Sequence, residues 1–289
     1  MNKDHEKLMT DLQRILATQD FKSEAELNAF LNKLMEQEIP SFPTEALSFE
    51  EQAQDLVFEA YKLPTAKGKQ KVIQALELDC DCIEAYEYLG LKEPIIEIGI
   101  AYFNMGVTIG RDIFGGEFLE EHKGMFWGIH ETRAFMRSMH SYANSLYSLS
   151  KVEESIAIME EMIELNPNDN QGVRDTLMLY LIEIDENEKF EKYVTMFEGE
   201  ESAFYLFNKA LSAFKIKGEG MDANRKLSLA IKHNKFVVKK LISGKEITQL
   251  SQMYGIGDEN EADYYVFYAQ FIWQETVGAL DWLKKHNVN

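Results

Sequence analysis

Residues that cross-link a chain or interrupt its helices are scarce in this sequence. Only two cysteines, Cys80 and Cys82, and five prolines occur among 289 residues. Cysteines one residue apart rarely reach disulfide geometry, and without a second pair or a nearby histidine they make a poor zinc site. We therefore expect structural cysteines, or at most a weakly redox-active pair, in a reducing compartment. The sequence predicts no metal site and no cofactor.

Positive charge is also in short supply. Lysine and arginine total 30 against 49 aspartates and glutamates, which gives a formal net charge of −19. Such a chain repels nucleic-acid phosphates and anionic membrane surfaces, so we expect neither nucleic acid nor membrane as a partner. An acidic surface usually serves solubility, and a basic partner is the functional alternative.

No long uninterrupted apolar run is present. The first twenty residues are charged and mixed, and the most apolar stretch, 95–113, contains Glu97, Asn104 and Arg111. Neither segment has the pattern of a secretion signal or a clean membrane span. We expect a cytoplasmic protein.

Catalytic motifs are missing as well. The six histidines form neither His-x-x-x-His nor His-Glu-x-x-His, and no Gly-x-Ser-x-Gly elbow or Walker-type phosphate loop occurs. The sequence therefore predicts a protein that is not an enzyme, with no catalytic residue assigned. An unrecognised site around His130, Glu131 and Arg133 is the alternative.

Helical periodicity dominates what is present. Residues 1–48 are expected to form an N-terminal helical segment and linker, with helices inside 4–37 and a proline-containing tether over 39–47. Ser23 and Glu26 have the spacing of a capping box. Two apolar stripes mark these helices: Leu8, Leu12, Ile15, Leu16 and Leu27, Phe30, Leu31, Leu34. Further helices are expected over 49–63 and 67–78.

An internal period of 34 residues relates the segments 136–169, 170–203 and 204–237. Met139, Val173 and Phe207 occupy one apolar column of this alignment, and other columns behave alike. Each segment is expected to hold two helices, which lie over 137–149 with 152–165, 171–185 with 187–198, and 202–216 with 222–233. Asp169 or Asn170 can cap the helix that starts at Gln171. Stacked helix pairs bury their apolar faces and leave one concave surface.

The residues of the first segment resemble the tetratricopeptide repeat, which implies an all-α, right-handed superhelix of helix pairs. The positions that carry the resemblance are Met139, Tyr142, Ala143, Leu146, Ser155, Met159, Met162 and Pro167. A further match to the repeat begins at Ala85-Tyr86-x-Tyr88-Leu89-Gly90.

A second resemblance rests on Phe126-Trp127-Gly128 and Glu131-Thr132-Arg133, and on the segments 165–174 and 254–262. These residues are similar to bacterial repeat proteins related to the suppressor of tumorigenicity 7 family. That family brings no established reaction.

The predicted organisation has three parts. The N-terminal segment covers 1–48, and a helical-repeat domain covers 49–237 with an insertion at about 106–132. Residues 238–289 form C-terminal capping helices, expected over 246–253, 260–273 and 277–285, because the end of a stack of helix pairs needs a polar cover.

The repeat resemblance implies that the first helix of each pair lines the concave face. Arg137, Asn144 and Arg174 stand where some members of the superfamily place Lys, Asn and Arg donors that grip a carboxylate. Guanidinium groups bind carboxylates bidentately, which makes the chemistry sensible. The alternative is that the two arginines pair with nearby Glu131 and Asp175.

Glycines and aromatic residues mark the predicted insertion. It either packs as a loop onto the concave surface, which we favour because aromatic rings bury large areas, or gates access of a ligand. The full set of predicted ligand contacts is Arg137, His140, Asn144, Tyr147, Gln171, Arg174, Asn208, Phe126, Trp127, Glu131 and Arg133.

The function that this sequence favours is a scaffold or adaptor that holds a protein or peptide in the groove, with a carboxylate or acidic segment as the contacted group. A peptide-sensing regulator whose superhelix changes shape on binding is an alternative of another class, with the N-terminal helices as its effector. The sequence leaves the partner's identity and the oligomeric state open.

Overall fold

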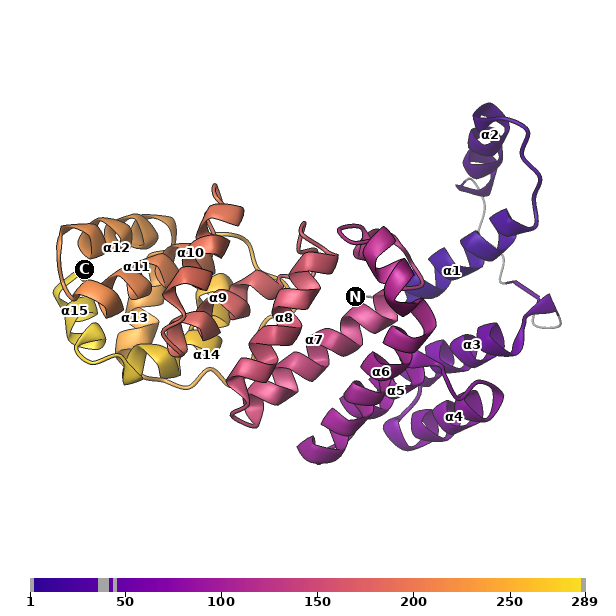
Figure 1. The fold of residues 1–289 in the computed structure, drawn as a ribbon, viewed down its shortest axis with the longest axis horizontal. Helices are drawn as coiled ribbons and strands as arrows, with labels where there is room; N and C mark the ends of the chain where they lie inside the picture. The colour runs from indigo at the N-terminus through magenta and orange to yellow at the C-terminus, as the bar shows by residue number, and fades with distance from the viewer. Residues whose placement is uncertain (1–2, 36–41, 44–45, 287–289) are drawn as a thin grey trace. The chain divides into compact units, whose positions relative to one another are not determined.

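The computed structural model describes residues 3–35, 42–43 and 46–286 (Figure 1). These residues form the α-helices α1 to α15 and a short 3₁₀-helix, η2, and none of them lies in a β-strand. The predicted all-α class is therefore confirmed. No helix in the described part of the chain combines the length and the apolar character that crossing a bilayer requires. The tether predicted over 39–47 falls largely outside the described residues.

The chain divides into two compact units, Met1–Asn168 and Asp169–Asn289. The division falls inside 49–237, the segment predicted as one repeat domain. The first unit contains α1 (Lys3–Ala17), α2 (Glu24–Met35), α3 (Phe49–Tyr61), α4 (Thr65–Leu78), α5 (Ile83–Leu91), α6 (Ile96–Glu121), η2 (Phe126–Gly128), α7 (Arg133–Ser148) and α8 (Val152–Leu165).

Three helix pairs build the first unit: α3 with α4, α5 with α6, and α7 with α8. Helix α3 begins at a capping box, in which Ser48 Oγ accepts from Glu51 N at 3.3 Å and the Glu51 carboxylate accepts from Ser48 N at 2.9 Å. Apolar side chains of consecutive pairs share one core, in which Val57, Val72 and Tyr88 are fully buried.

Residues 106–121, which the sequence assigns to an insertion, continue helix α6. Gly110 serves helix packing here, because a Cβ at this position would lie 2.2 Å from a ring carbon of Phe135 on α7. Gly115, at φ 63°, has a non-helical backbone conformation, so α6 consists of two helical stretches that meet at a kink. This stretch is therefore helical and not the packed loop that the sequence favoured, and only residues 122–132 form an irregular connection around η2.

Helices α1 and α2 confirm the expected N-terminal helices, but α1 packs unexpectedly. Its buried residues are Glu6, Asp11 and Arg14, whereas Leu8 of the predicted apolar stripe is 39% exposed. In α2, no side chain whose burial is described is fully buried. The helix start predicted from Ser23 is confirmed, since Ser23 Oγ accepts from Glu26 N at 3.2 Å.

The second unit contains α9 (Val173–Glu183), α10 (Asn187–Met196), α11 (Ala203–Lys217), α12 (Met221–His233), α13 (Phe236–Ser243), α14 (Glu259–Glu275) and α15 (Ala279–His286). With α7 and α8, the helices α9 to α12 confirm the six helices that the 34-residue period predicts. Helix α14 packs against both α9 and α11.

Two features near the end of the chain differ from the prediction. Residues 246–253 form no helix, and α13, which was not predicted, precedes them. The segment 246–253 stays mostly exposed. A helix this short needs packing to be stable in water, which explains its absence. The helices predicted over 260–273 and 277–285 correspond to α14 and α15.

Candidate functional site

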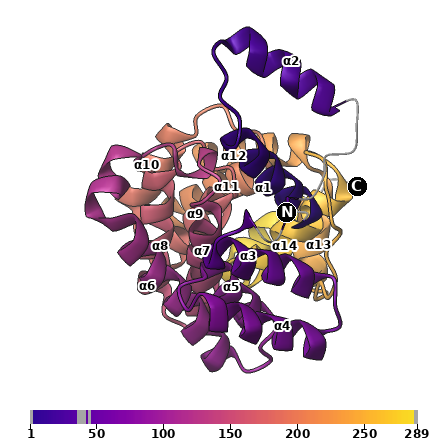
Figure 2. The same ribbon diagram turned by 90° about the vertical axis from the view of Figure 1, so that its right-hand side faces the viewer.

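In the first unit, the charged side of α1 lies against the first helices of the helix pairs. Helix α1 packs on α3 (Figure 2), and its side chains also reach residues of α5 and α7. We call the surface that α1 covers the inner face of the first unit. Its polar residues are Glu51, Asp55, Tyr61, Glu84, Glu87, His130 and Arg137.

Arg137 on α7 is the centre of this surface. Its Nη1 donates to Glu6 Oε1 on α1 at 2.6 Å, and its Nε donates to Glu87 Oε2 on α5 at 2.9 Å. Its Nη2 donates to Glu84, also on α5. Three carboxylates from two helices therefore contact all three nitrogens of one guanidinium group, whose planar fork suits carboxylate partners.

Lys3 of α1 adds a second cation to the same carboxylates. Its Nζ pairs with Glu84, lies 3.1 Å from Glu6 Oε2, and sits 4.7 Å from the centre of the Tyr61 ring. We refer to Lys3, Glu6, Tyr61, Glu84, Glu87 and Arg137 as the Arg137 cluster. The cluster holds three carboxylates against two cations, so one negative charge remains unbalanced.

Burial and the charges of the cluster shift the pKa values of Glu87, Glu84 and Lys3. Burial and the neighbouring Glu84 raise the pKa of Glu87 to about 7. Burial also pushes the pKa of Glu84 upward, but Arg137 and Lys3 outweigh it and hold this pKa below its ordinary value. The pKa of Lys3 is raised, because Glu84 and Glu87 outweigh the effect of its burial. Glu87 is thus the carboxyl group of the cluster that takes up a proton near neutral pH.

A second group of ion pairs fixes the other end of α1. Arg14 donates from Nη1 to Asp55 Oδ1 at 2.8 Å and from Nε to Glu51 Oε1 at 3.1 Å, both on α3. Lys7 lies 3.2 Å from the other oxygen of Asp55. Lys3, Lys7 and Arg14 therefore all meet carboxylates of the inner face.

His130 contacts α1 from the segment before α7. Its Nε2 lies 2.9 Å from Thr10 Oγ1, and the Thr10 hydroxyl donates to the Glu6 carbonyl oxygen at 3.0 Å. With the hydroxyl hydrogen directed to Glu6, the tautomer that fits has His130 Nε2 as the donor to Thr10. Burial, followed by Arg133, lowers the pKa of His130. A neutral donor histidine cannot act as the base for this hydroxyl group.

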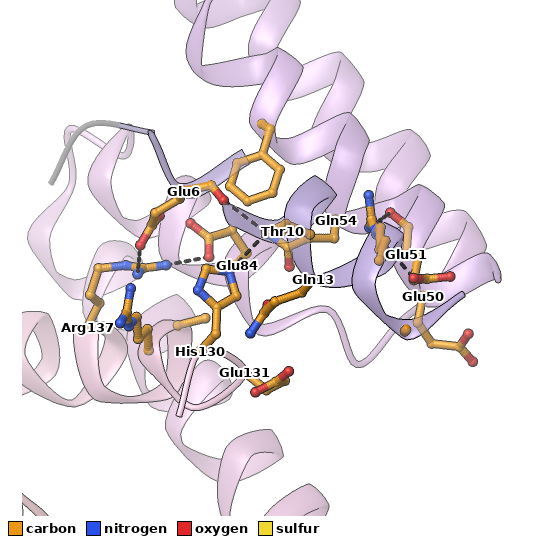
Figure 3. A pocket seen from close by; sticks show the side chains of 15 residues that line it. Glu6, Thr10, Gln13, Glu50, Glu51, Gln54, Glu84, His130, Glu131 and Arg137 are labelled. Carbon is orange, nitrogen blue, oxygen red and sulfur yellow. Dashed lines mark hydrogen bonds and ion pairs between the residues drawn. The ribbon is translucent and has the colours of Figure 1, made fainter. Parts of the chain in front are cut away.

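An open cavity of about 490 Å³ remains beside α1 (Figure 3). Five carboxylate and three guanidinium side chains line it, together with a few uncharged ones. The lining residues are Glu6, Thr10, Gln13, Arg14, Ala17, Glu50, Glu51, Gln54, Phe58, Glu84, His130, Glu131, Arg133, Ala134 and Arg137. A cavity of this size, lined by several carboxylates, accommodates one or two long side chains of a partner.

Several predicted contact residues lie in the first unit around this cavity. Glu131 is exposed and lines the cavity, as does Arg133, whose Nε donates to the Trp127 carbonyl oxygen at 3.1 Å. The Trp127 ring is half-buried under the Arg133 guanidinium group. Phe126 is fully buried among aromatic rings of α6 and α7 and lies in the core of the first unit.

The other predicted residues of α7 are less available than expected. Arg137 is paired with Glu6, Glu84 and Glu87 of the same chain. The sequence suggested Glu131 as its partner. Burial lowers the pKa of His140. Asn144 and Tyr147 are half-buried, and Asn144 Oδ1 is a buried acceptor for which the described residues supply no donor.

A predicted contact residue of the second unit, Asn208, is also bonded to residues of its own unit. Asn208 is fully buried, accepts from Tyr265 of α14 at 3.3 Å and donates to the Asp175 carbonyl at 3.5 Å. It therefore lies in the core of the second unit, where Tyr265 of α14 contacts it.

Arg174 and Gln171 lie at the start of the second unit, and Gln171 is half-buried. Arg174 pairs with Asp169 at 3.2 Å and Glu200 at 3.4 Å, where the sequence suggested Asp175. Asp169 accepts from Val173 N at 2.7 Å, which confirms its capping role, although the helix begins at Val173 and two residues later than predicted.

The residues of α1 and α5 that build the inner face were missed from the sequence. The available signal was charge periodicity: Lys3, Lys7 and Arg14 share one side of a helix, and Glu84 and Glu87 are three residues apart. Within the described residues, no group of three or more His, Cys, Asp or Glu side chains is arranged to hold a metal ion.

Comparisons of the chain with protein-family models, curated proteins and solved structures find no match.

Proposed function

We propose that the chain is a helical-repeat protein of the tetratricopeptide type, and that it acts as a protein-binding adaptor. The inner face of its first unit would take up a helical segment of a partner. The observation that carries the proposal is the docking of α1, whose polar side chains occupy this face through Arg137, Glu84 and Asp55. A surface that binds one helix of its own chain has the geometry to bind a similar helix from another protein.

The way in which α1 is held favours exchange. Its three buried residues are all charged, and no apolar residue of α1 is buried. Removing ionised groups from water costs free energy that offsets much of their mutual attraction. By contrast, α14 in the second unit is held through buried Tyr265, Val266 and Trp273, among others. We therefore assign exchange to the inner face under α1 and a permanent structural role to α14.

The connection between α1 and the rest of the unit also suits exchange. Residues 18–48 join α1 to α3, and this length lets α1 leave the inner face without disturbing the helix pairs. While attached, α1 competes with any partner at the high effective concentration that a tether provides.

A peptide-sensing regulator is the second candidate, favoured by one specific observation. Helix α2 follows α1 and has a half-buried apolar side that includes Phe30 and Leu31. Displacement of α1 by a peptide would free both helices to act on another protein. The enzymatic alternative around His130 has no such support, because the geometry makes His130 a donor to Thr10.

The test uses the full-length chain with Lys3→Glu, Lys7→Glu and Arg14→Glu, so that its own α1 is repelled from the inner face. A fluorescent peptide with the sequence of residues 3–17, blocked at both ends, is titrated against this variant and the unchanged chain. The proposal predicts saturable binding to the variant and weaker binding to the unchanged chain.

A peptide with the same three charge reversals is the control and should not bind. Circular dichroism checks that the variant keeps its helices. If the variant loses its helices, titration of the unchanged chain at high peptide concentration provides a second measurement. Equal binding of the native and charge-reversed peptides would refute the proposed function.

A further inference from the structure

The cavity beside α1 shows which side chains a partner could use that α1 lacks. Five residues of α1 line it, at spacings that put them on one side of the helix: Glu6, Thr10, Gln13, Arg14 and Ala17. Of these, Gln13 is exposed and uncharged, and Ala17 is too short to fill the space. Helix α1 therefore leaves much of the cavity empty.

Glu131 stands across this space from α1. Figure 3 shows Gln13 and Glu131 on facing sides of the cavity, from α1 and from the segment before α7 respectively. Glu131 is exposed, and among the described residues it has no ion-pair partner. The nearest cation in sequence, Arg133, donates from Nε to the Trp127 carbonyl oxygen and lies over the Trp127 ring. A guanidinium group on α1 at the position of Gln13 would find a carboxylate that the native helix does not use.

The rest of the inner face sets the remaining requirements. Arg14 forms ion pairs with Glu51 and Asp55, and Lys7 also pairs with Asp55. Lys3 pairs with Glu84 and Glu87. A helix that makes these contacts needs basic side chains at positions i, i+4 and i+11, where i is the position of Lys3. Arg137 pairs with a carboxylate at i+3, which is Glu6 in α1.

We infer that the partner of the inner face is a basic helix of another protein, with Lys or Arg at i, i+4, i+10 and i+11 and an acidic residue at i+3. Its side chain at i+10 fills the cavity and pairs with Glu131, and this additional contact lets it displace α1. Helix α1 is then an internal competitor that matches the partner everywhere except at Gln13. This inference rests on the proposed function and adds the chemistry of the partner to it.

The charge of the chain supports a basic partner. The formal net charge is −19, and the cavity itself is lined by more carboxylate than guanidinium groups. Attraction between a basic helix and an acidic protein accelerates encounter and disfavours acidic competitors. The buried ion pairs then select for position along the helix.

The experiment compares three blocked fluorescent peptides on the full-length chain that carries Lys3→Glu, Lys7→Glu and Arg14→Glu. One peptide has the sequence of residues 3–17, one adds Gln13→Arg, and the third adds His5→Arg on the exposed side of α1 as a charge-matched control. We expect the Gln13→Arg peptide to bind roughly fivefold tighter than the native one, as an additional ion pair at a partly exposed site allows. The His5→Arg peptide should show no such gain.

Two further substitutions in the chain test whether Glu131 causes the tighter binding of the Gln13→Arg peptide. With Glu131→Gln, the advantage of the Gln13→Arg peptide should disappear, whereas with Glu77→Gln, an exposed carboxylate of α4 outside the cavity, it should remain. If the native peptide binds but Gln13→Arg brings no gain, or if the gain survives Glu131→Gln, the inference is overturned while the proposed function stands. If no peptide binds, the proposed function fails as well.

Discussion

Arg137 and Glu6 are 131 positions apart in the chain, and Arg137 Nη1 donates to Glu6 Oε1 over 2.6 Å. This contact joins the first helix of the protein to the third helix pair of the first unit. Both side chains are largely withdrawn from solvent, at 13% and 3% exposure. Removing one partner of such a pair is costly even where the complete pair stabilises little, because the partner that remains is a buried, uncompensated ion.

Removal of Arg137 should therefore be costly. We expect Arg137→Met to lower the free energy of unfolding by about 3–5 kcal/mol, because Glu6, Glu84 and Glu87 would lose their shared cation. Arg111→Met is the matched control, since Arg111 is 43% exposed and pairs with Glu161 on the surface. That change should cost less than about 1 kcal/mol. Urea unfolding followed by circular dichroism measures both, and equal costs would contradict the role of Arg137.

Much of the fold was predictable because its period is local. The 34-residue spacing placed α7 to α12 correctly, since each helix pair buries its stripe against an immediate neighbour in the sequence. The glycines of α6 were misread as a loop, because a glycine that admits Phe135 looks the same in a sequence as one that bends the chain. Whether a glycine packs against a ring or bends the chain depends here on Phe135, a side chain of another helix.

The candidate site was much less predictable. Arg137 was identified as a functional residue, but its partners Glu6, Glu84 and Glu87 come from helices far away in the sequence. The apolar stripe of α1 suggested that Leu8 would face the core, whereas the charged side of the helix does. In the second unit, nothing in the sequence of α11 shows that α14 buries Asn208.

Phe126 and Trp127 are neighbours with different surroundings, which gives a second prediction. Phe126 is fully buried, so Phe126→Ala should lower the free energy of unfolding by about 3–5 kcal/mol. Trp127 is half-buried and its ring contacts the Arg133 guanidinium group, so Trp127→Ala should cost only about 1–2 kcal/mol. Urea unfolding of the two variants checks the order, and a larger cost for Trp127→Ala would show that its ring carries the packing of this segment.

The close approach of α6 and α7 predicts a contrast between two glycines. Gly110→Ala should destabilise the protein by about 1–3 kcal/mol, because the added Cβ would collide with the Phe135 ring. At Gly116 an added Cβ meets nothing within 4 Å, so Gly116→Ala should be neutral or stabilising by up to about 1 kcal/mol. Thermal unfolding of both variants measures the difference. A harmless Gly110→Ala would mean that α6 and α7 lie farther apart.

The Arg137 cluster predicts a pH dependence of stability. The pKa of Glu87 is raised from its ordinary 4.5 to about 7, so the folded state binds this proton more tightly than the unfolded state. Its stabilising contribution is complete below pH 4.5 and is lost as the pH rises through about 7. Glu87→Gln should remove this loss, and its melting temperature should fall less than that of the unchanged chain between mildly acidic and mildly alkaline buffer.

Glu77→Gln is the control for that pH series. It removes one exposed carboxylate of α4 and should leave the pH dependence of the unchanged chain in place. Identical pH profiles for Glu87→Gln and Glu77→Gln would show that Glu87 does not carry the proton.

The most direct test of the account is to hold α1 reversibly on the inner face. Thr10→Cys and His130→Cys, introduced with Cys80→Ser, place two thiols where side chains of α1 and the segment before α7 now meet. Burial raises the pKa of Cys82 to about 12, so this thiol stays protonated and unreactive. A cleavable thiol-to-thiol linker joins the two introduced cysteines, and binding of the labelled peptide of residues 3–17 is measured before and after cleavage. We predict that the linked form binds the peptide roughly tenfold more weakly or not at all, and that cleavage restores binding in the same molecules. Equal binding in the linked and cleaved forms would contradict the claim that α1 and a partner helix compete for one surface.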